Sequence, residues 1–200
     1  MRTHERGAIA VATAALLLAA ATSCANDRTD PAEAGSHSPS SPAPSRSSPT
    51  PPSEGETASE AASAVLRQYF ATVDLVRQDP KRPETDLDAV ASSSQLTAQK
   101  NLLKSQRDGG LLQVGDTKIV ELNVESVSLD SPATALIDVC WDVSGVDIVD
   151  ADGKSVVSPD RKDVGWTRFT VTNDKWDSAP TEGWRVSGGS DLENAPCAGS

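Results

Sequence analysis

The sequence predicts an α+β fold in which N-terminal helices pack on a curved antiparallel sheet. Apolar residues recur at helical spacing over the first part of the folded region and alternate at strand spacing over the rest. The stretch before the helices is too polar and too rich in proline to form a core. Helices followed by a run of strands are typical of helices that cover one face of an antiparallel sheet. We therefore expect three parts: 1–23, 24–59 and a domain over 60–200.

The first part has the features of a secretory signal peptide. Arg2 and Arg6 give it a positive start, and residues 8–21 form an apolar stretch. This stretch is too short to be a membrane-spanning helix. Three small residues, 21–23, then precede Cys24. We expect the protein to be exported.

These small residues before Cys24 resemble the lipobox of bacterial lipoproteins. In that class, cleavage exposes the cysteine and a diacylglyceryl group is attached to its sulfur. The resemblance implies that Cys24 is lipidated and anchors the protein to the membrane on its extracytoplasmic face. Ala21 stands where the class usually has leucine. Cleavage after Ser23 without lipid, which would give a secreted soluble protein, is the alternative.

The cysteine count agrees with lipidation. The chain has three cysteines, and an exported protein is left with an odd thiol unless something consumes one. Lipid on Cys24 leaves Cys140 and Cys197, which an oxidising compartment favours as a disulfide. On the chain-entropy model such a bridge would contribute about 4 kcal/mol of stability.

Residues 25–59 predict a disordered tether. Proline, serine, threonine, alanine and glycine dominate this segment, which cannot bury enough apolar surface to order itself. Its reach would lie between about 30 Å as a coil and about 100 Å when fully extended. The segment would therefore hold the domain clear of the lipid headgroups.

Three helices are expected at the start of the domain. Thr57 and Glu60 fit a capping box, which places the start of the first helix near Thr57 and its end near Gln78. A short second helix over 86–91 and a third from Ser94 to the glycines at 109–110 follow. The first helix has one apolar stripe, and the second offers two residues to the core. The stripe consists of Ala62, Leu66, Tyr69, Val73 and Val76, the second helix offers Leu87 and Val90, and the apolar residues of the third are Leu96, Leu102 and Leu103.

The remainder predicts strands. Residues 118–129 alternate, with Val120, Leu122 and Val124 on one face, and a change of phase indicates a bulge near Glu125. Residues 133–143 alternate more strictly, and their odd-numbered apolar residues should face the core. A strand over 164–172 would place Trp166 and Phe169 on opposite faces. The last strand should begin at 183–186.

This order of elements is similar to that of small actinobacterial lipoproteins of nuclear-transport-factor-2-like (cystatin-like) fold. The resemblance rests on the strand at 139–142, the Gly-Trp-Arg-Val segment at 183–186 and the closing Cys197, and it covers about residues 60–197. It implies a cone-shaped sheet that wraps around helices and leaves a pocket. Some members of that superfamily are enzymes and many only bind, so fold does not decide function.

Composition excludes several classes of function. The two histidines, His4 and His37, lie outside the predicted domain, so histidine-based catalysis and histidine metal sites are not expected there. The net charge of −11 argues against a nucleic-acid partner, which needs clustered lysine and arginine. No motif indicates a cofactor or a metal. No catalytic residue is predicted.

Two groups of residues admit a functional interpretation. Asp138 and Asp142 flank Cys140 on one face of a strand and could form a carboxylate pair, although solvent-facing positions on a half-buried strand are the preferred interpretation. Aromatic side chains could line a pocket or fill the core. Tyr69, Trp141 and Trp184 favour the core, whereas Trp166 and Trp176 are left open.

These features favour a non-catalytic envelope module that binds an envelope protein or a small ligand while tethered to the membrane through Cys24. The alternative is a carboxylate-based cyclase, isomerase or hydrolase in the pocket, which would need acids that point inward. The alternation places Asp138 and Asp142 outward and counts against it.

Overall fold

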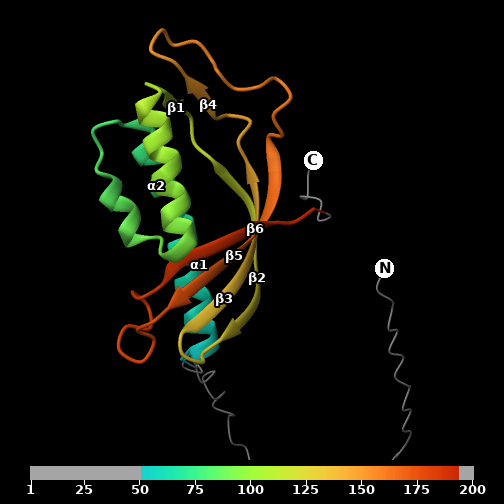
Figure 1. Cartoon of the computed structure of the whole chain (residues 1–200). Coiled ribbons are helices and arrows are strands. Elements are labelled where there is room, and N and C mark those ends of the chain that lie inside the picture. The colour runs from blue at the N-terminus through green and yellow to red at the C-terminus, as the bar shows by residue number, and fades with distance from the viewer. Residues whose placement is uncertain (1–50, 194–200) are drawn as a thin grey trace, which may run out of the picture. The chain divides into compact units, whose positions relative to one another are not determined.

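A computed structural model describes residues 51–193 of the chain. The predicted signal peptide, Cys24, the linker up to residue 50 and Cys197 lie outside the described residues. Within 51–193 the elements come in the predicted order, helices first and strands after (Figure 1). No helix in this range is long and apolar enough to cross a membrane. The α+β class is confirmed.

Helix α1 covers Glu54–Gln78 and begins one turn before the predicted start. Its capping box is formed by Ser53 and Glu56: the Ser53 amide donates to Glu56 Oε2 at 2.7 Å, and the Glu56 amide donates to Ser53 Oγ at 3.3 Å. The predicted box at Thr57 and Glu60 is therefore wrong, and residues 54–59, predicted as tether, are helical. No proline lies between Ser53 and Thr57, so the helix extends back to the first serine after the proline pair.

The apolar stripe of α1 is confirmed. Its buried residues recur at intervals of three and four, which places them on one helical face against the sheet. They are Ala58, which was not predicted, and every residue predicted for this stripe: Ala62, Leu66, Tyr69, Val73 and Val76.

Two shorter helical elements follow. A 3-10 helix, η1, covers Glu84–Ala89 and brings Leu87 and Val90 into the core as predicted. Helix α2 covers Ser93–Asp108 and ends at Gly109. Of its adjacent leucines, Leu103 is buried and Leu102 is 51% exposed. Adjacent residues on a helix point about 100° apart, so a narrow apolar face takes only one of the two.

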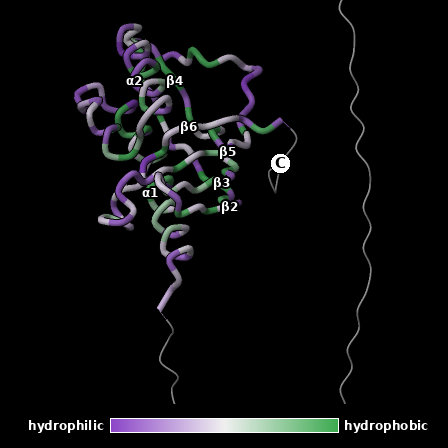
Figure 2. The backbone as a smooth tube through the Cα atoms, turned by 60° about the horizontal axis from the view of Figure 1, so that its bottom comes forward, coloured by the Kyte–Doolittle hydropathy of each residue, from purple (hydrophilic) through white to green (hydrophobic). Residues whose placement is uncertain are grey.

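Four antiparallel strands form the main sheet in the order β2-β3-β5-β6. A separate two-stranded sheet pairs β1 with β4. Both short strands were missed, because three residues are too few to show alternation. Figure 2 shows hydrophobic stretches along the strands of the main sheet. The bounds are β1 Leu112–Val114, β2 Lys118–Ser128, β3 Ala133–Asp142, β4 Asp147–Val149, β5 Val164–Asn173 and β6 Arg185–Asp191.

Two register shifts interrupt the pairing of β2 with β3. The shift between Val124 and Ser126 confirms the bulge predicted near Glu125. A second shift, between Ile119 and Glu121, was not predicted, and it leaves Val120 half exposed. Ile119, rather than Val120, therefore packs against the core, and the predicted shared face of Val120, Leu122 and Val124 is wrong.

The odd-numbered residues of β3 face the helices as predicted. Ala133, Ala135, Ile137 and Val139 are fully buried and share one core with α1. On β5, Phe169 joins this core, whereas Trp166 lies on the other face. The helices thus cover one face of the main sheet (Figure 1).

Candidate functional site

A cavity of about 350 Å³ lies between the helices and the main sheet. Its volume is at the lower end of the range of small-molecule sites. One wall, the helical wall, consists of side chains from α1 and α2. The other, the sheet wall, consists of residues from β3, β5 and β6. Residues on the helical wall are Tyr69, Phe70, Val73, Arg77, Gln95 and Gln99, and those on the sheet wall include Trp141, Thr167, Phe169, Gly189 and Asp191.

Helical periodicity places three of these residues in a column. Tyr69, Val73 and Arg77 are spaced four residues apart on α1, so each lies one turn above the previous one on the same face. The first two continue the apolar stripe into the core. Arg77 is the charged residue at the end of the column, and it brings a guanidinium to this wall.

A chain of hydrogen bonds joins the polar groups of the helical wall. Arg77 Nη2 donates to Gln99 Oε1 at 2.7 Å, and Gln99 Nε2 lies 2.7 Å from the Tyr69 hydroxyl. The Gln95 side-chain amide also contacts that hydroxyl. Because a guanidinium can only donate, Arg77 determines which end of the Gln99 amide is its oxygen. Gln99 must then donate to Tyr69.

A second chain runs along the sheet wall. Trp141 Nε1 donates to Thr167 Oγ1 at 3.0 Å, and Thr167 Oγ1 donates to Asp191 Oδ1 at 2.7 Å. Each N–H and O–H donor in this chain has an acceptor. The chain fixes the plane of the Trp141 ring, so an aromatic face lies at the cavity in one orientation.

Aromatic rings line the cavity on both walls. Tyr69 and Phe70 meet edge to face at 5.6 Å between ring centroids, and Phe70 meets Phe169 in the same way at 5.6 Å. Tyr69 and Phe169 lie 6.0 Å apart. These distances and angles are in the preferred range for aromatic pairs. The three rings form one aromatic cluster, the aromatic base of the cavity.

Burial shifts the pKa of two groups in the helical wall. Desolvation lowers the pKa of the Arg77 guanidinium, and the nearby Tyr69 and Asp74 oppose this shift. Desolvation raises the pKa of the Tyr69 hydroxyl, and the contacts with Gln95, Arg77 and Gln99 oppose that shift. Both shifts have the same main cause, the burial of these two groups in the helical wall.

Asp138 and Asp142 do not form a carboxylate pair at this cavity. Asp138 is almost fully buried, contrary to the predicted solvent-facing position, because Arg168 of the neighbouring strand covers it. Arg168 Nε and Nη2 donate to the two carboxylate oxygens at 2.6 and 2.7 Å. Asp142 accepts from the Ser144 amide at 2.7 Å, and hydrogen bonding by Ser144 lowers the pKa of its carboxyl. Neither acid lines the cavity.

Cys140 is fully buried and disulfide-bonded. It lies opposite Trp166 in the register of β3 and β5. Cys24 and Cys197 are outside the described residues, so the pairing of Cys140 with Cys197 and the lipidation of Cys24 stay predictions.

The candidate aromatic residues occupy three different environments. Tyr69 and Trp141 line the cavity. Trp184 is fully buried in the core, where it meets Trp176 at 6.0 Å. Trp166 belongs to neither place, and its buried indole N–H has no hydrogen-bond partner within residues 51–193. The core position expected for Trp184 is confirmed, whereas Trp141 combines partial burial with a place at the cavity.

Sequence reasoning missed the polar residues of the cavity. Arg77, Gln95, Gln99 and Asp191 were not singled out. One signal was available for Arg77, because it continues the Tyr69–Val73 column and is a charged residue at a core-facing position. Asp191 had no such signal, since it ends a strand, β6, whose glycines and serines hide the alternation.

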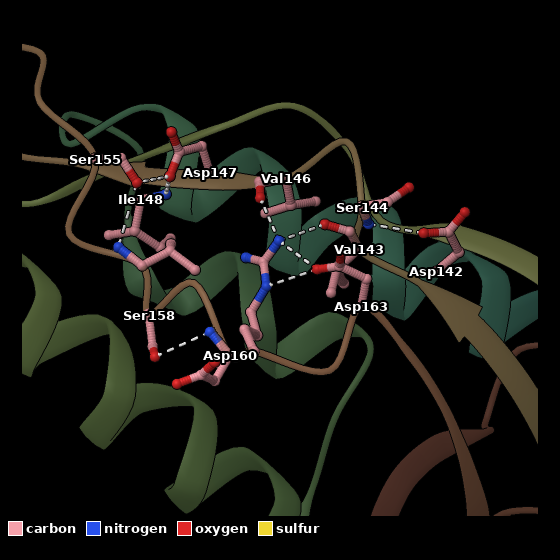
Figure 3. A network of polar contacts seen from close by, with 12 residues as sticks. Asp142, Val143, Ser144, Val146, Asp147, Ile148, Ser155, Ser158, Asp160 and Asp163 are labelled. Atoms are coloured by element: carbon pink, nitrogen blue, oxygen red, sulfur yellow. Dashed lines mark hydrogen bonds and ion pairs between the residues drawn. The ribbon is translucent and has the colours of Figure 1, made fainter.

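A second hollow lies beside the loop from β4 to β5, but polar groups at this hollow form hydrogen bonds with one another. Figure 3 shows the carbonyls of Val143 and Val146 and the Asp163 carboxylate around one guanidinium. It belongs to Arg161, and its N···O distances are 2.9 to 3.0 Å. Asp147 accepts from the Ser155 hydroxyl at 2.7 Å. These hydrogen bonds hold the loop between β4 and β5 in place, so this hollow is a weaker candidate for a ligand site than the cavity. Within 51–193, no cluster of three or more side chains could hold a metal ion.

Comparisons with known proteins show similarity of fold only. No family model and no curated protein matches the chain. Among solved structures, it is similar to the intermembrane space region of the chloroplast protein ARC6, with a TM-score of 0.50 and 20% identity over 68% of this chain and 96% of that one. A de novo designed β-sheet protein matches with a TM-score of 0.24 and 12% identity, over 72% of this chain and 91% of that one.

Proposed function

We propose that the protein is an exported, lipid-anchored and non-catalytic binding module that holds a small ligand in the cavity between its helices and its sheet. The observation that carries this proposal is the cavity itself: about 350 Å³, with an aromatic base and polar groups from both walls. An apolar cavity with a few convergent polar groups is the usual form of a small-molecule site. The ligand would be oriented by the polar groups and stabilised by the rings.

The chemistry of the lining supports binding rather than catalysis. Among the lining residues, Asp191 is the single carboxylate, and its Oδ1 already accepts from Thr167. A mechanism with paired carboxylates would need a second acid within reach. Tyr69 is engaged by two glutamines, and its raised pKa makes it a poor base at neutral pH.

We infer a curved, cone-like sheet of the nuclear-transport-factor-2-like type, in which the pocket is enclosed by helices. The order of elements and the cavity between the two layers support it. In such a cone, the open end would admit the ligand while the chain is tethered.

Anchoring through Cys24 follows from the sequence features at residues 1–24. The proline-rich linker would then carry the domain away from the membrane surface. Replacement Cys24→Ser should abolish labelling by a fatty acid and release the protein from the membrane. Membrane association that persists in Cys24→Ser would contradict the anchor, but not ligand binding.

Native mass spectrometry tests the binding function. The chain is purified gently from the envelope of the producing cell, beside a variant Val143→Phe that fills the cavity and a control Val156→Phe. Val143 lines the cavity, whereas Val156 is half exposed elsewhere. We expect an additional mass on the unmodified protein and on Val156→Phe, and its loss from Val143→Phe. A bare mass, or an additional mass that Val143→Phe retains, would contradict binding in the cavity.

A further inference from the structure

Arg77 is a largely buried cation without a carboxylate partner. None of the ion pairs within residues 51–193 includes it. Its guanidinium donates to one side chain in this range, the neutral amide of Gln99. A guanidinium has five N–H donors, and charged groups are rarely buried without a partner of opposite charge. The cavity therefore presents donors that the protein itself does not use.

The nearest acid on the same helix is committed to other groups. Asp74 accepts from Gln113 Nε2 at 2.7 Å, from the Thr117 amide at 2.8 Å and from the Thr117 hydroxyl at 2.9 Å. These contacts hold its carboxylate on the side of β1 and the turn before β2. Asp74 therefore does not serve as a contact partner for Arg77, and burial of Arg77 is not offset by an ion pair.

The neighbours of Arg77 are set up to support a bound carboxylate. Gln99 directs its oxygen to the guanidinium and its amide nitrogen to Tyr69, and Gln95 extends the chain. This arrangement holds the guanidinium plane in place while its other donors stay available. Arginine binds a carboxylate through two parallel hydrogen bonds when its plane is fixed in this way.

The rest of the cavity determines what the carboxylate is attached to. The rings of Tyr69, Phe70 and Phe169 and the indole of Trp141 provide an apolar surface for an aromatic or branched aliphatic group. Asp191 lies on the sheet wall and would repel a second negative charge on the ligand. The volume of about 350 Å³ restricts the ligand to a small molecule.

We infer that the cavity binds a small apolar monocarboxylate, whose carboxylate is held by Arg77 and whose apolar part packs on the aromatic base. This inference rests on the proposed function and names its ligand class. The carboxylate would supply the directly contacting negative charge that no carboxylate of the described residues gives Arg77.

Three probes of one shape test the inference: phenylacetate, the neutral phenylacetamide and the cationic phenethylamine. Each is titrated into the whole exported chain carrying Cys24→Ser, and binding is followed by the indole N–H signals in NMR. The four tryptophans provide an internal control, because Trp141 lines the cavity and Trp184 and Trp166 do not. We expect the Trp141 signal to move, with phenylacetate binding about tenfold or more tighter than phenylacetamide.

Two substitutions locate the carboxylate. Arg77→Gln should weaken phenylacetate about tenfold or more and leave phenylacetamide nearly unchanged. The control Arg67→Gln removes the same charge from an exposed position on the same helix and should have little effect. Gln99→Glu keeps Arg77 and gives it an internal carboxylate, so it should also weaken phenylacetate, whereas Gln68→Glu on the exposed face of α1 should not. Gln99→Glu thus preserves the test if Arg77→Gln does not fold.

The outcomes separate the two proposals. Binding of phenylacetamide or phenethylamine as tight as that of phenylacetate, with the Trp141 signal shifted, would overturn the carboxylate inference and leave the binding function intact. Equal phenylacetate affinity in Arg77→Gln or Gln99→Glu would also overturn it. If no probe moves the Trp141 signal at millimolar concentration while the domain is folded, the carboxylate inference fails, and the binding function is then decided by native mass spectrometry alone.

Discussion

The indole ring of Trp141 lies against Gly165, its register partner on the neighbouring strand. A Cβ at Gly165 would come within 2.2 Å of Trp141 Cζ2. Any larger residue here must displace a ring that is itself fixed by a hydrogen bond to Thr167. The cavity therefore depends on a glycine that does not line it.

Gly165→Ala should destabilise the protein by about 1–3 kcal/mol, because the ring must leave its place or the strands must separate. The matched control is Gly145→Ala, where an added Cβ would meet nothing within 4 Å. Chemical denaturation gives the free energy of unfolding, and the indole N–H signal of Trp141 reports the ring. Equal stability of the two variants would show that the ring adapts without cost.

Ser53 rather than Thr57 should stabilise the start of α1. The Ser53 hydroxyl accepts a hydrogen bond from the Glu56 amide, and the Glu56 carboxylate accepts one from the Ser53 amide. Loss of an N-cap side chain costs about 1 kcal/mol, so Ser53→Ala should lower the free energy of unfolding by about that amount. Thr57→Ala is the control, since Thr57 Oγ1 only donates to the Ser53 carbonyl. A larger loss of stability in Thr57→Ala than in Ser53→Ala would instead support the capping box predicted at Thr57.

The Asp138–Arg168 pair should show an asymmetry between its two partners. The Asp138 side chain is 7% exposed, whereas that of Arg168 is 39% exposed. Arg168→Leu leaves a buried carboxylate without its bidentate partner, whereas Asp138→Leu leaves an arginine that can reach solvent and Glu125. Arg168→Leu should therefore be the more destabilising single change, and the double variant should recover part of the loss. A double-mutant cycle of unfolding free energies measures both effects, and additive losses would contradict the pair's coupling.

Long periodic elements could be predicted from the sequence, but residues at bulges could not. The α1 stripe and the alternation of β3 are long enough for burial to follow the periodicity, and both were predicted correctly. In β2, one extra residue at Val120 reverses the faces, and this depends on its pairing with β3 rather than on β2 alone. The β1–β4 pair likewise forms between segments far apart in the chain.

The same distinction applies to the cavity. Tyr69 and Trp141 could be proposed from their place in periodic elements. Gln99 and Asp191 line the cavity only because the tertiary structure brings α2 beside α1 and β6 beside β5. Their polar side chains look like surface residues in the sequence, and only their contacts with Tyr69 and Thr167 show that they belong to the site.

Tyr69 should titrate above the ordinary pKa of tyrosine, because burial disfavours the phenolate. The unfolded chain takes up the ordinary value of about 10. Since the folded pKa is raised, folding stability is unaffected below pH of about 10 and falls as the pH rises from there through the folded pKa. This loss should be absent in Tyr69→Phe. Tyr69 is the single tyrosine in the chain, so near-ultraviolet absorbance of the phenolate follows it alone.

The charge of Arg77 also affects the pKa of Tyr69. The positive charge of Arg77 lowers the pKa of Tyr69 and so opposes the effect of burial. Arg77→Gln should therefore move the titration of Tyr69 to still higher pH, whereas the exposed Arg67→Gln should leave it in place. Bound phenylacetate should act as Arg77→Gln does, because its carboxylate neutralises the same charge. A titration of Tyr69 at its ordinary pKa would contradict the burial of its hydroxyl. A titration that Arg77→Gln leaves unchanged would contradict the electrostatic coupling of Tyr69 with Arg77 in the helical wall.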